Sequence, residues 1–463
     1  MEKVSFKNII VGFGKGGKTL AKFLAKKGES VAVIEESTRM YGGTCINIGC
    51  IPSKSLIVNG QKGLKFPDAA RKKADLTEKL NQKNYSLVAD EATATVLDGK
   101  ARFISDTEIE ISANGEALQL LEGERIFINT GAKPIIPSIK GLPESKNIVT
   151  STELMDLTIL PEALTIIGSG YIGLEFASMF TLYGSKVTVL NAFDNFLPRE
   201  DDDIAARIKE DMESAGVTFK LGVKIEQVSD EADKTEIRII EKDGKTVTLF
   251  ADKVLVATGR KANTEGLGLE NTSVTLNERG EIIVNEKLET TAPNIWAIGD
   301  VHGGLQFTYI SLDDFRIIQS QLYGDGMRTL NNRGSVPNSV FITPTLSSVG
   351  LNEKAAKAAS LDYRLFKLEA SAIPKSAVLS QPKGLLKALV DPETQEILGA
   401  TIYAEDSHEV INLLSLAVNA KIPYTIVRDQ IFTHPTMSEA LNDLFAAANV
   451  VMVPNVEENC VYL

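Results

Sequence analysis

The chain has 463 residues, enough for about three domains and a large buried core. Its 43% hydrophobic and 24% charged residues are ordinary for a globular protein, and they exclude the collagen-like, mucin-like and disordered classes. A formal net charge of −12 disfavours nucleic acids and anionic lipids as partners, and no apolar run is long enough to cross a membrane. The sequence therefore predicts a cytoplasmic protein without nucleic-acid or membrane partners.

The N-terminal segment predicts a β-α-β unit. An apolar strand at 7–11 precedes a glycine loop and a helical pattern, and a second strand at 30–34 ends in Glu35. The loop glycines are Gly12, Gly14 and Gly17. Glycines at this spacing let a pyrophosphate approach the helix N-terminus, and a carboxylate after the second strand binds the ribose hydroxyls. The motif alone is weak evidence, but its position between a strand and a helix predicts dinucleotide binding.

The residues that follow predict an exposed helix over 71–84 and a set of antiparallel strands over 94–127. Residues 129–137 carry glycine and two prolines and predict a loop that is a plausible domain boundary.

A second glycine loop then repeats the pattern between a strand at 164–167 and a helix at 174–183. Its glycines are Gly168, Gly170 and Gly173. This repeat predicts a second nucleotide fold inserted into the first. Its second strand, 186–190, ends in Asn191, which does not repel the 2′-phosphate of NADP as an acid would, yet no arginine follows directly. We expect weak coenzyme discrimination, tilted toward NADPH.

The rest of the chain predicts a further strand at 253–258, alternating strands over 341–398 and helices over 405–445. Three cysteines are too few for a disulfide framework. Cys45 and Cys50 lie five residues apart, and Cys460 is almost at the end of the chain. Because histidine is scarce and no second Cys/His pair lies nearby, no metal site is expected. Two buried structural thiols are the alternative, but the flanking Gly-Gly-Thr and Pro-Ser-Lys favour a redox dithiol.

Five motifs occur in a fixed order along the chain: GGTCINIGCIPSK, GSGYIGLE, VATGR, NIWAIGDV and FTHPTMSE. Together they resemble the class I flavoprotein disulfide reductases, the family of glutathione reductase, dihydrolipoamide dehydrogenase and mercuric reductase. The resemblance extends to about residue 448. It implies an NAD(P)H oxidoreductase that binds FAD and NADPH or NADH and acts through a redox-active disulfide.

The resemblance also implies an α/β fold with two Rossmann-like domains, for FAD and NAD(P), and a C-terminal α+β dimerisation domain. The expected parts are 1–148 and 271–338 for the FAD domain, 149–270 for the NAD(P) domain, 339–448 for the dimerisation domain and 449–463 for a tail. Cys460, in this tail, receives no role.

Roles follow residue by residue from the resemblance. Cys45 would be the thiol that meets the substrate, and Cys50 the thiolate against the isoalloxazine. Lys54 would lie near flavin N5 and pair with Glu175. Tyr171 would gate the nicotinamide pocket.

His434, oriented by Glu439, would be the general acid/base, donated across the interface of a homodimer; a structural role is favoured for His302 and His408. Histidine titrates near neutral pH, which suits this role. Asp300 would hold the ribityl chain, with Thr308 near the ring. The other residues assigned to the cofactors are Gly43, Thr44, Ala101, Thr130, Gly131, Ile172, Gly259 and Arg260.

Four stretches resemble a narrower branch, the reactive-chlorine-resistance flavoproteins and hypothiocyanous acid reductases. They are residues 40–50, 196–201, 304–314 and 429–445. This branch implies a small-molecule oxidant, with hypothiocyanous acid favoured, which is reduced to thiocyanate. Copper(II) reduction, a low-molecular-weight disulfide substrate and dihydrolipoamide dehydrogenase activity are the alternatives.

Other readings fit the chain less well. Mercury reduction is disfavoured because the C-terminal vicinal cysteine pair is missing, and glutathione reduction because the substrate-binding arginines are not seen. The thiol pair together with His434 and Glu439 also argues against a redox sensor that does no catalysis, because a binding module needs no acid/base.

Overall fold

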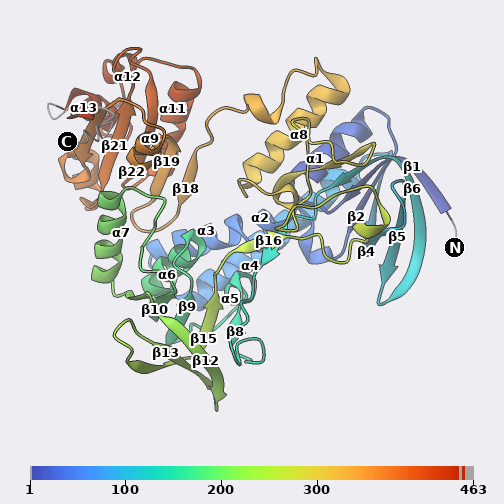
Figure 1. Ribbon diagram of the computed structural model, residues 1–463, viewed down its shortest axis with the longest axis horizontal. Coiled ribbons are helices and arrows are strands. Elements are labelled where there is room, and N and C mark those ends of the chain that lie inside the picture. Colours follow the sequence, from blue (N-terminus) through green and yellow to red (C-terminus); the bar gives the residue numbers. More distant parts are fainter. Residues whose placement is uncertain (1–2, 448–450, 454–463) are drawn as a thin grey trace, which may run out of the picture. The chain divides into compact units, whose positions relative to one another are not determined.

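The computed structural model describes residues 3–447 and the backbone of 451–453 (Figure 1). Cys460 and most of the predicted tail lie outside the described residues. The chain forms two compact units. The first comprises the chain up to Ser138, Ile148–Pro161 and Leu255–Arg333, and the second comprises Ile139–Asn147, Glu162–Val254 and the chain from Gly334 onward.

The helices of the first unit are α1 (Lys15–Lys26), α2 (Thr44–Asn47), α3 (Cys50–Gln61), α4 (Phe66–Ala89), α5 (Ser151–Met155) and α8 (Thr308–Tyr323), with 3-10 helices η1 (Thr38–Met40), η2 (Leu269–Asn271), η3 (Gly299–His302) and η4 (Leu330–Asn332). Its strands are β1 (Lys3–Val11), β2 (Val31–Glu35), β3 (Ala94–Asp98), β4 (Lys100–Phe103), β5 (Glu108–Ala113), β6 (Glu116–Ile128), β7 (Ala132–Pro134), β8 (Ile148–Val149), β16 (Arg260–Ala262) and β17 (Ile295–Ala297).

A seven-stranded sheet organises this unit, in the order β3-β2-β1-β6-β5-β4 with β17 also paired to β6. In β2, the four apolar residues Val31–Ile34 are all buried, which is typical of a central parallel strand covered on both faces. Helices α1 and α8 lie side by side against the sheet (Figure 1). The residue that ends β2 and the loop that ends β1 therefore meet at one edge of the sheet, where α1 begins.

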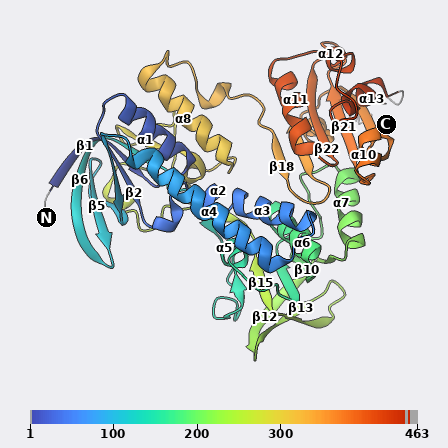
Figure 2. The same ribbon diagram turned by 180° about the vertical axis from the view of Figure 1, so that it is seen from behind.

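Two predictions for this region change. The helix expected over 71–84 is the middle of the longer α4, which packs beside α3 (Figure 2). The prediction of antiparallel strands over 94–127 is wrong in part: β4, β5 and β6 are antiparallel, but β3 pairs in parallel with β2, and β6 with β1. Alternation of polar and apolar residues shows that a strand has one buried face and says nothing of its direction.

The helices of the second unit are α6 (Tyr171–Tyr183), α7 (Asp202–Ser214), α9 (Glu353–Ala358), α10 (Pro374–Val378), α11 (Ser407–Asn419), α12 (Tyr424–Arg428) and α13 (Ala440–Ala446), with η5 (Ala370–Ala372). Its strands are β9 (Ala163–Ile167), β10 (Lys186–Asn191), β11 (Thr218–Leu221), β12 (Lys224–Glu231), β13 (Lys234–Ile240), β14 (Thr246–Ala251), β18 (Asn338–Val340), β19 (Leu346–Gly350), β20 (Tyr363–Glu369), β21 (Leu385–Val390), β22 (Ile397–Tyr403) and β23 (Val451–Val453). Strand β15 (Lys253–Val256) spans the chain boundary between the units.

The second unit holds a parallel β-α-β arrangement and an antiparallel α+β layer. Strands β9, β10 and β11 are parallel, and α6 connects β9 to β10. The six-stranded sheet β18-β19-β22-β21-β20-β23 packs its apolar face against α11 and α13. Its edge strand β23 comes from the predicted tail. Helices α11, α12 and α13 confirm the helical prediction for 405–445. No helix in the described part of the chain is long and apolar enough to cross a membrane.

Candidate functional site

The first glycine loop leaves no room for side chains. Gly12 has a φ of +99°, and a Cβ there would lie 2.4 Å from the backbone oxygen of Asn129. Gly14 is the N-cap of α1, and a Cβ there would lie 2.4 Å from the side-chain oxygen of the same asparagine. The loop also touches the segment before the thiol pair, because a Cβ on Gly43 would lie 2.7 Å from the Cα of Gly14. The loop glycines before α1 carry no side chains, which suits the close approach of a phosphate.

Glu35 is held at this loop by backbone donors. Its carboxylate accepts hydrogen bonds from the N–H groups of Phe13, at 3.0 Å, and Ser37, at 3.1 Å. Burial raises the pKa of Glu35, and these hydrogen bonds act against that rise. The carboxylate thus lies beside the loop at the end of β2, where the ribose of a dinucleotide binds.

Sequence reasoning missed two residues that fix this loop. Asn129 accepts a hydrogen bond from the N–H of Gly17 at 3.0 Å and donates one to the carbonyl of Ile298 at 2.7 Å. The Ser311 hydroxyl accepts the N–H of Gly16 at 3.0 Å. Asn129 directly precedes the predicted cofactor residue Thr130, and Ser311 lies in the stretch 304–314, but neither residue received a role from the sequence.

The remaining predicted FAD residues of this unit are distributed over several of its strands, helices and loops. Asp300 is in η3, where burial raises its pKa and the charge of Arg260 lowers it. Arg260 donates to the carbonyl of Ala132 at 2.5 Å. The others are Ala101 in β4, Thr130 and Gly131 after β6, Gly259 before β16, Thr44 at the start of α2 and Lys54 in α3. The crowded glycines before α1 and the anchored Glu35 fit FAD.

Substituting alanine for Gly12 is expected to give protein that has lost bound FAD. Both the left-handed backbone and the contact with backbone atoms oppose a side chain there. Gly28 is the matched control, because its φ is +80° but no atom lies within 4 Å of a Cβ. The ratio of flavin to protein absorbance measures the difference. Equal flavin content in G12A and G28A would contradict this account.

Cys45 and Cys50 contact one another in the first unit, both as thiols. Cys45 lies in α2, and Cys50 begins α3. The hydrogen bond with Cys50, followed by burial, raises the pKa of the Cys45 thiol, whereas Thr308 and the charge of Lys18 lower it. The Cys50 sulfur also lies 3.8 Å from the Thr308 hydroxyl. The structure therefore brings three of the predicted site residues together.

The second glycine loop joins β9 to α6. Gly168 has a φ of +110°, Gly170 is the N-cap of α6, and a Cβ on Gly173 would lie 2.1 Å from the Gly168 carbonyl oxygen. Gly170 makes no side-chain capping hydrogen bond at the start of α6. The loop therefore fits the pyrophosphate of a second dinucleotide.

Tyr171 and Ile172 begin α6. The Tyr171 hydroxyl donates to Glu200 at 2.5 Å, and burial raises the pKa of both groups. Glu175 accepts the N–H of Phe341 at 2.8 Å. Lys54 and Glu175 lie in different units, so their pairing stays a prediction.

The predicted acid/base pair is in place within the second unit. His434 Nδ1 lies 2.8 Å from Glu439 Oε2, while Glu439 Oε1 accepts the N–H of Thr436 at 3.0 Å. The hydrogen bond with His434 lowers the pKa of Glu439. Because the carboxylate accepts, Nδ1 carries the proton, and Nε2 is left for another partner. The imidazole side chain is 68% exposed within one subunit.

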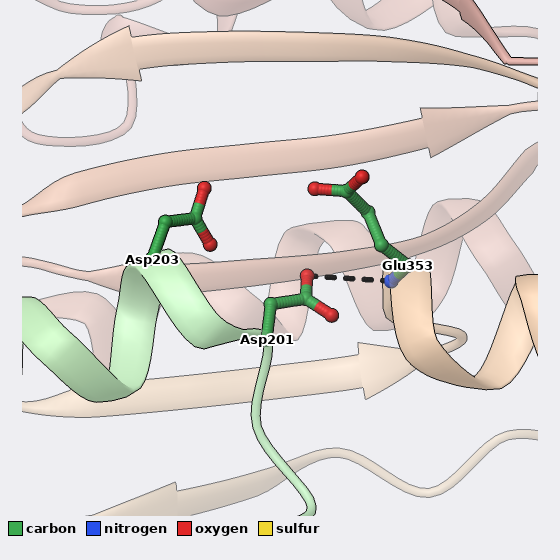
Figure 3. Close-up of side chains that lie close together, drawn as sticks. All are labelled: Asp201, Asp203 and Glu353. Atoms are coloured by element: carbon green, nitrogen blue, oxygen red, sulfur yellow. Dashed lines mark hydrogen bonds between the residues drawn. The ribbon is translucent and has the colours of Figure 1, made fainter.

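Three carboxylates gather in the second unit, with their oxygens within 4.8 Å of one another: Asp201, Asp203 and Glu353 (Figure 3). The ammonium of Lys387, a side chain only 1% exposed, contacts all three, at 2.6, 2.8 and 2.5 Å. Asp201 also accepts the N–H of Glu353. We describe this set as the Lys387 cluster. Because the lysine already supplies the positive charge that a metal ion would bring, the Lys387 cluster is an ion-pair network. It connects α7 to α9 and β21.

Comparison with known proteins agrees with this geometry. Residues 6–314 match the family described as pyridine nucleotide-disulphide oxidoreductase, and residues 336–445 match the dimerisation domain of that family. The chain is a pyridine nucleotide–disulfide oxidoreductase. It is accordingly an FAD-dependent oxidoreductase that uses a pyridine nucleotide, which confirms the predicted family, fold, enzyme class and cofactors. The dimerisation domain supports a homodimer.

Several relatives of this oxidoreductase extend over nearly its whole length. It is 46% identical to the probable pyridine nucleotide-disulfide oxidoreductase RclA of Escherichia coli K12, over 95% of this chain and 99% of the relative. It is 33% identical to a mercuric reductase of Staphylococcus aureus, over 94% and 80% of the two chains. It is 32% identical to a dihydrolipoyl dehydrogenase of Bacillus subtilis, over 95% and 97%.

Solved structures show the same fold for the oxidoreductase. The HOCl-induced flavoprotein disulfide reductase RclA from E. coli superposes with a TM-score of 0.91 at 46% identity, covering 96% of this chain and 100% of the other. A Cu(II) complex of the same protein superposes with a TM-score of 0.93 over 97% and 100%. The chain is therefore a flavoprotein disulfide reductase of the RclA type.

Proposed function

We propose that this enzyme reduces hypothiocyanous acid to thiocyanate with NAD(P)H, through Cys45 and Cys50, as a defence against oxidants in the cytoplasm. The observation that carries the proposal is the contact between the two thiols, which lie beside Thr308 in the unit that fits FAD. The similarity to an HOCl-induced reductase supports an oxidant as the substrate. Bound FAD would supply the redox chemistry that carries two electrons from NAD(P)H to the Cys45–Cys50 disulfide.

Cys45 then acts as the nucleophile. Its thiolate attacks the sulfur of hypothiocyanous acid, so that an S–S bond forms, the S–O bond breaks and hydroxide leaves. Cys50 attacks the sulfur of Cys45, which restores the disulfide and releases thiocyanate. Each turnover converts NAD(P)H and hypothiocyanous acid to NAD(P)+, thiocyanate and water, so atoms and electrons balance.

His434 protonates the leaving hydroxide in this proposal. Glu439 holds the Nδ1 proton, so the imidazole presents Nε2 to the substrate. Because His434 would come from the second subunit, it and Cys45 would belong to the same site only when the homodimer forms.

Copper(II) is the second candidate substrate, because one related structure is a Cu(II) complex of RclA. A reduced dithiol holds two electrons, so it would reduce two copper(II) ions for each NAD(P)H. This reaction needs no attack on sulfur and no acid to protonate a leaving group. Replacing His434 by glutamine should therefore slow hypothiocyanous acid reduction while leaving copper(II) reduction almost unchanged.

The proposal is tested by steady-state NAD(P)H oxidation with hypothiocyanous acid, oxidised glutathione, lipoamide and copper(II). We expect saturable turnover with hypothiocyanous acid and a kcat/KM that exceeds that for the disulfides by at least about a hundredfold. A preference for glutathione or lipoamide would make the chain a housekeeping disulfide reductase and would contradict the proposal.

Coenzyme choice provides a separate prediction, at Asn191. The Asn191 amide donates to the carbonyl of Phe193 at 2.8 Å, at the end of β10 where an acid would select NADH. We expect kcat/KM for NADPH and NADH to differ by less than about tenfold, in favour of NADPH, and Asn191→Asp to shift the ratio toward NADH by about tenfold. A strong NADH preference in the unmodified enzyme would refute the prediction.

A further inference from the structure

Lys18 is a buried cation that the mechanism above does not use. It lies on the first turns of α1, its residue is only 6% exposed, and its ammonium contacts the side-chain oxygen of Asn84. Asn84, on α4, is also 6% exposed, and its amide donates to the carbonyl of Leu80 at 2.6 Å. Within residues 3–447, no carboxylate makes an ion pair with Lys18. A buried ammonium without a counter-ion is costly, so its retention calls for an anionic partner.

The Lys18–Asn84 contact lies directly behind the redox segment. A Cβ on Gly42 would lie 3.0 Å from the side chain of Asn84 and 3.0 Å from that of Ile46, so Asn84 lies against the segment that holds Cys45. The charges of Lys18 and Cys45 interact, and this interaction raises the pKa of Lys18 and lowers that of Cys45. A thiolate at Cys45 would supply such an anion.

We propose that Lys18 is a positioning residue whose ammonium stabilises the thiolate of Cys45, with Asn84 fixing its direction. The inference rests on the proposed function only in taking Cys45 as the attacking thiol. It explains how a half-buried thiol that is hydrogen-bonded to Cys50 supplies a nucleophile at neutral pH.

Other groups also change the pKa values of Lys18 and Cys45, and a test of the proposal must keep their effects constant. Lys15, on the same helix, opposes the charge of Lys18, and burial together with Lys15 lowers the pKa of Lys18 to about 8. Cys50 from α3 and the Thr308 hydroxyl from α8 act on Cys45. The ammonium and the thiolate therefore stabilise one another, and loss of either charge should shift the titration of the other.

The test uses the full-length holoenzyme with Cys50 and Cys460 replaced by serine, which leaves Cys45 as its only thiol. The rate of alkylation by iodoacetamide is measured from pH 5 to pH 10, in this background and with Lys18→Met, Lys18→Gln or Lys18→Arg added. His434 is unchanged throughout, so its effect on Cys45 is the same in every variant. Lys22→Met is the matched control, because Lys22 lies one turn further along α1 with a 34% exposed side chain.

Both neutral variants should raise the pKa of Cys45 by about one unit, and so slow alkylation at neutral pH by about tenfold. Lys18→Arg should restore most of the rate, and Lys22→Met should change nothing. An unshifted profile in K18M or K18Q, or an equal shift in K22M, would overturn the proposal. Loss of FAD from the Lys18 variants without a shift in the pKa of Cys45 would also overturn the proposal, because Lys18 would then bind the diphosphate of FAD. The proposed function fails on a different result, namely turnover of hypothiocyanous acid by an enzyme without Cys45.

Discussion

Replacing Cys45 by serine is expected to abolish turnover with hypothiocyanous acid, with a loss of at least about a thousandfold in kcat. A serine hydroxyl is not ionised at neutral pH and cannot form the sulfur–sulfur bond of the proposed adduct. Reduction of the bound flavin by NAD(P)H should persist, because it does not involve this thiol. Stopped-flow absorbance separates the two half-reactions.

The matched variant is Cys50→Ser, which leaves the attacking thiol in place. It should form the adduct on Cys45 once and then stop, because no second thiol releases thiocyanate. Mass spectrometry of the protein treated with hypothiocyanous acid detects that adduct. Full turnover by C45S would contradict the assignment of the nucleophile.

Replacing Lys387 by methionine is expected to lower the free energy of unfolding by about 3–5 kcal/mol. The change removes the one charge that contacts Asp201, Asp203 and Glu353 together, and leaves like charges side by side. Urea unfolding at fixed protein concentration measures the loss. The control is Lys367→Met, because that side chain is 40% exposed and contacts two of the same carboxylates. It should cost about 1 kcal/mol or less.

The pH dependence of the Lys387 variant distinguishes charge from packing. Burial alone would raise the pKa of Asp203 and Glu353, but hydrogen bonds with lysines lower both on balance. A carboxyl group whose pKa is lowered in the folded state stabilises the fold at pH values above its pKa in the unfolded chain. That stabilisation is lost as the pH falls through the folded-state pKa. The difference between the unmodified enzyme and K387M should therefore shrink in acid. A difference that stays constant with pH would indicate lost packing instead.

Site residues that lie together in a short segment of the chain could be predicted from the sequence. Both glycine loops follow from glycine spacing between a strand and a helix, whereas the roles of the thiol pair and of His434 and Glu439 came from short motifs that resemble a known family. The partners that act across the fold were not predictable. Asn129 and Ser311 reach the first loop from distant elements. The burial of Lys18 depends on packing against distant elements and does not follow from its place in a helical pattern.

Strand direction was also beyond the sequence pattern. Strands β3 and β6 alternate like antiparallel strands, yet each pairs in parallel with a strand of the nucleotide-binding unit. Direction is set by which elements connect the strands: α4 lies in the crossover from β2 to β3, whereas β6 follows β5 as its antiparallel neighbour. The glycine loops were predicted more reliably because close backbone approach restricts the residue type at each position.

The most direct test of the central claim is a single turnover without oxygen. The holoenzyme is reduced with one equivalent of NADPH and then mixed with one equivalent of hypothiocyanous acid, and thiols and thiocyanate are counted. We predict that two thiols per subunit are lost for each thiocyanate released, and that further NADPH restores them. Thiocyanate released while Cys45 and Cys50 stay reduced would show that the electrons bypass the thiol pair, and would contradict the proposed mechanism.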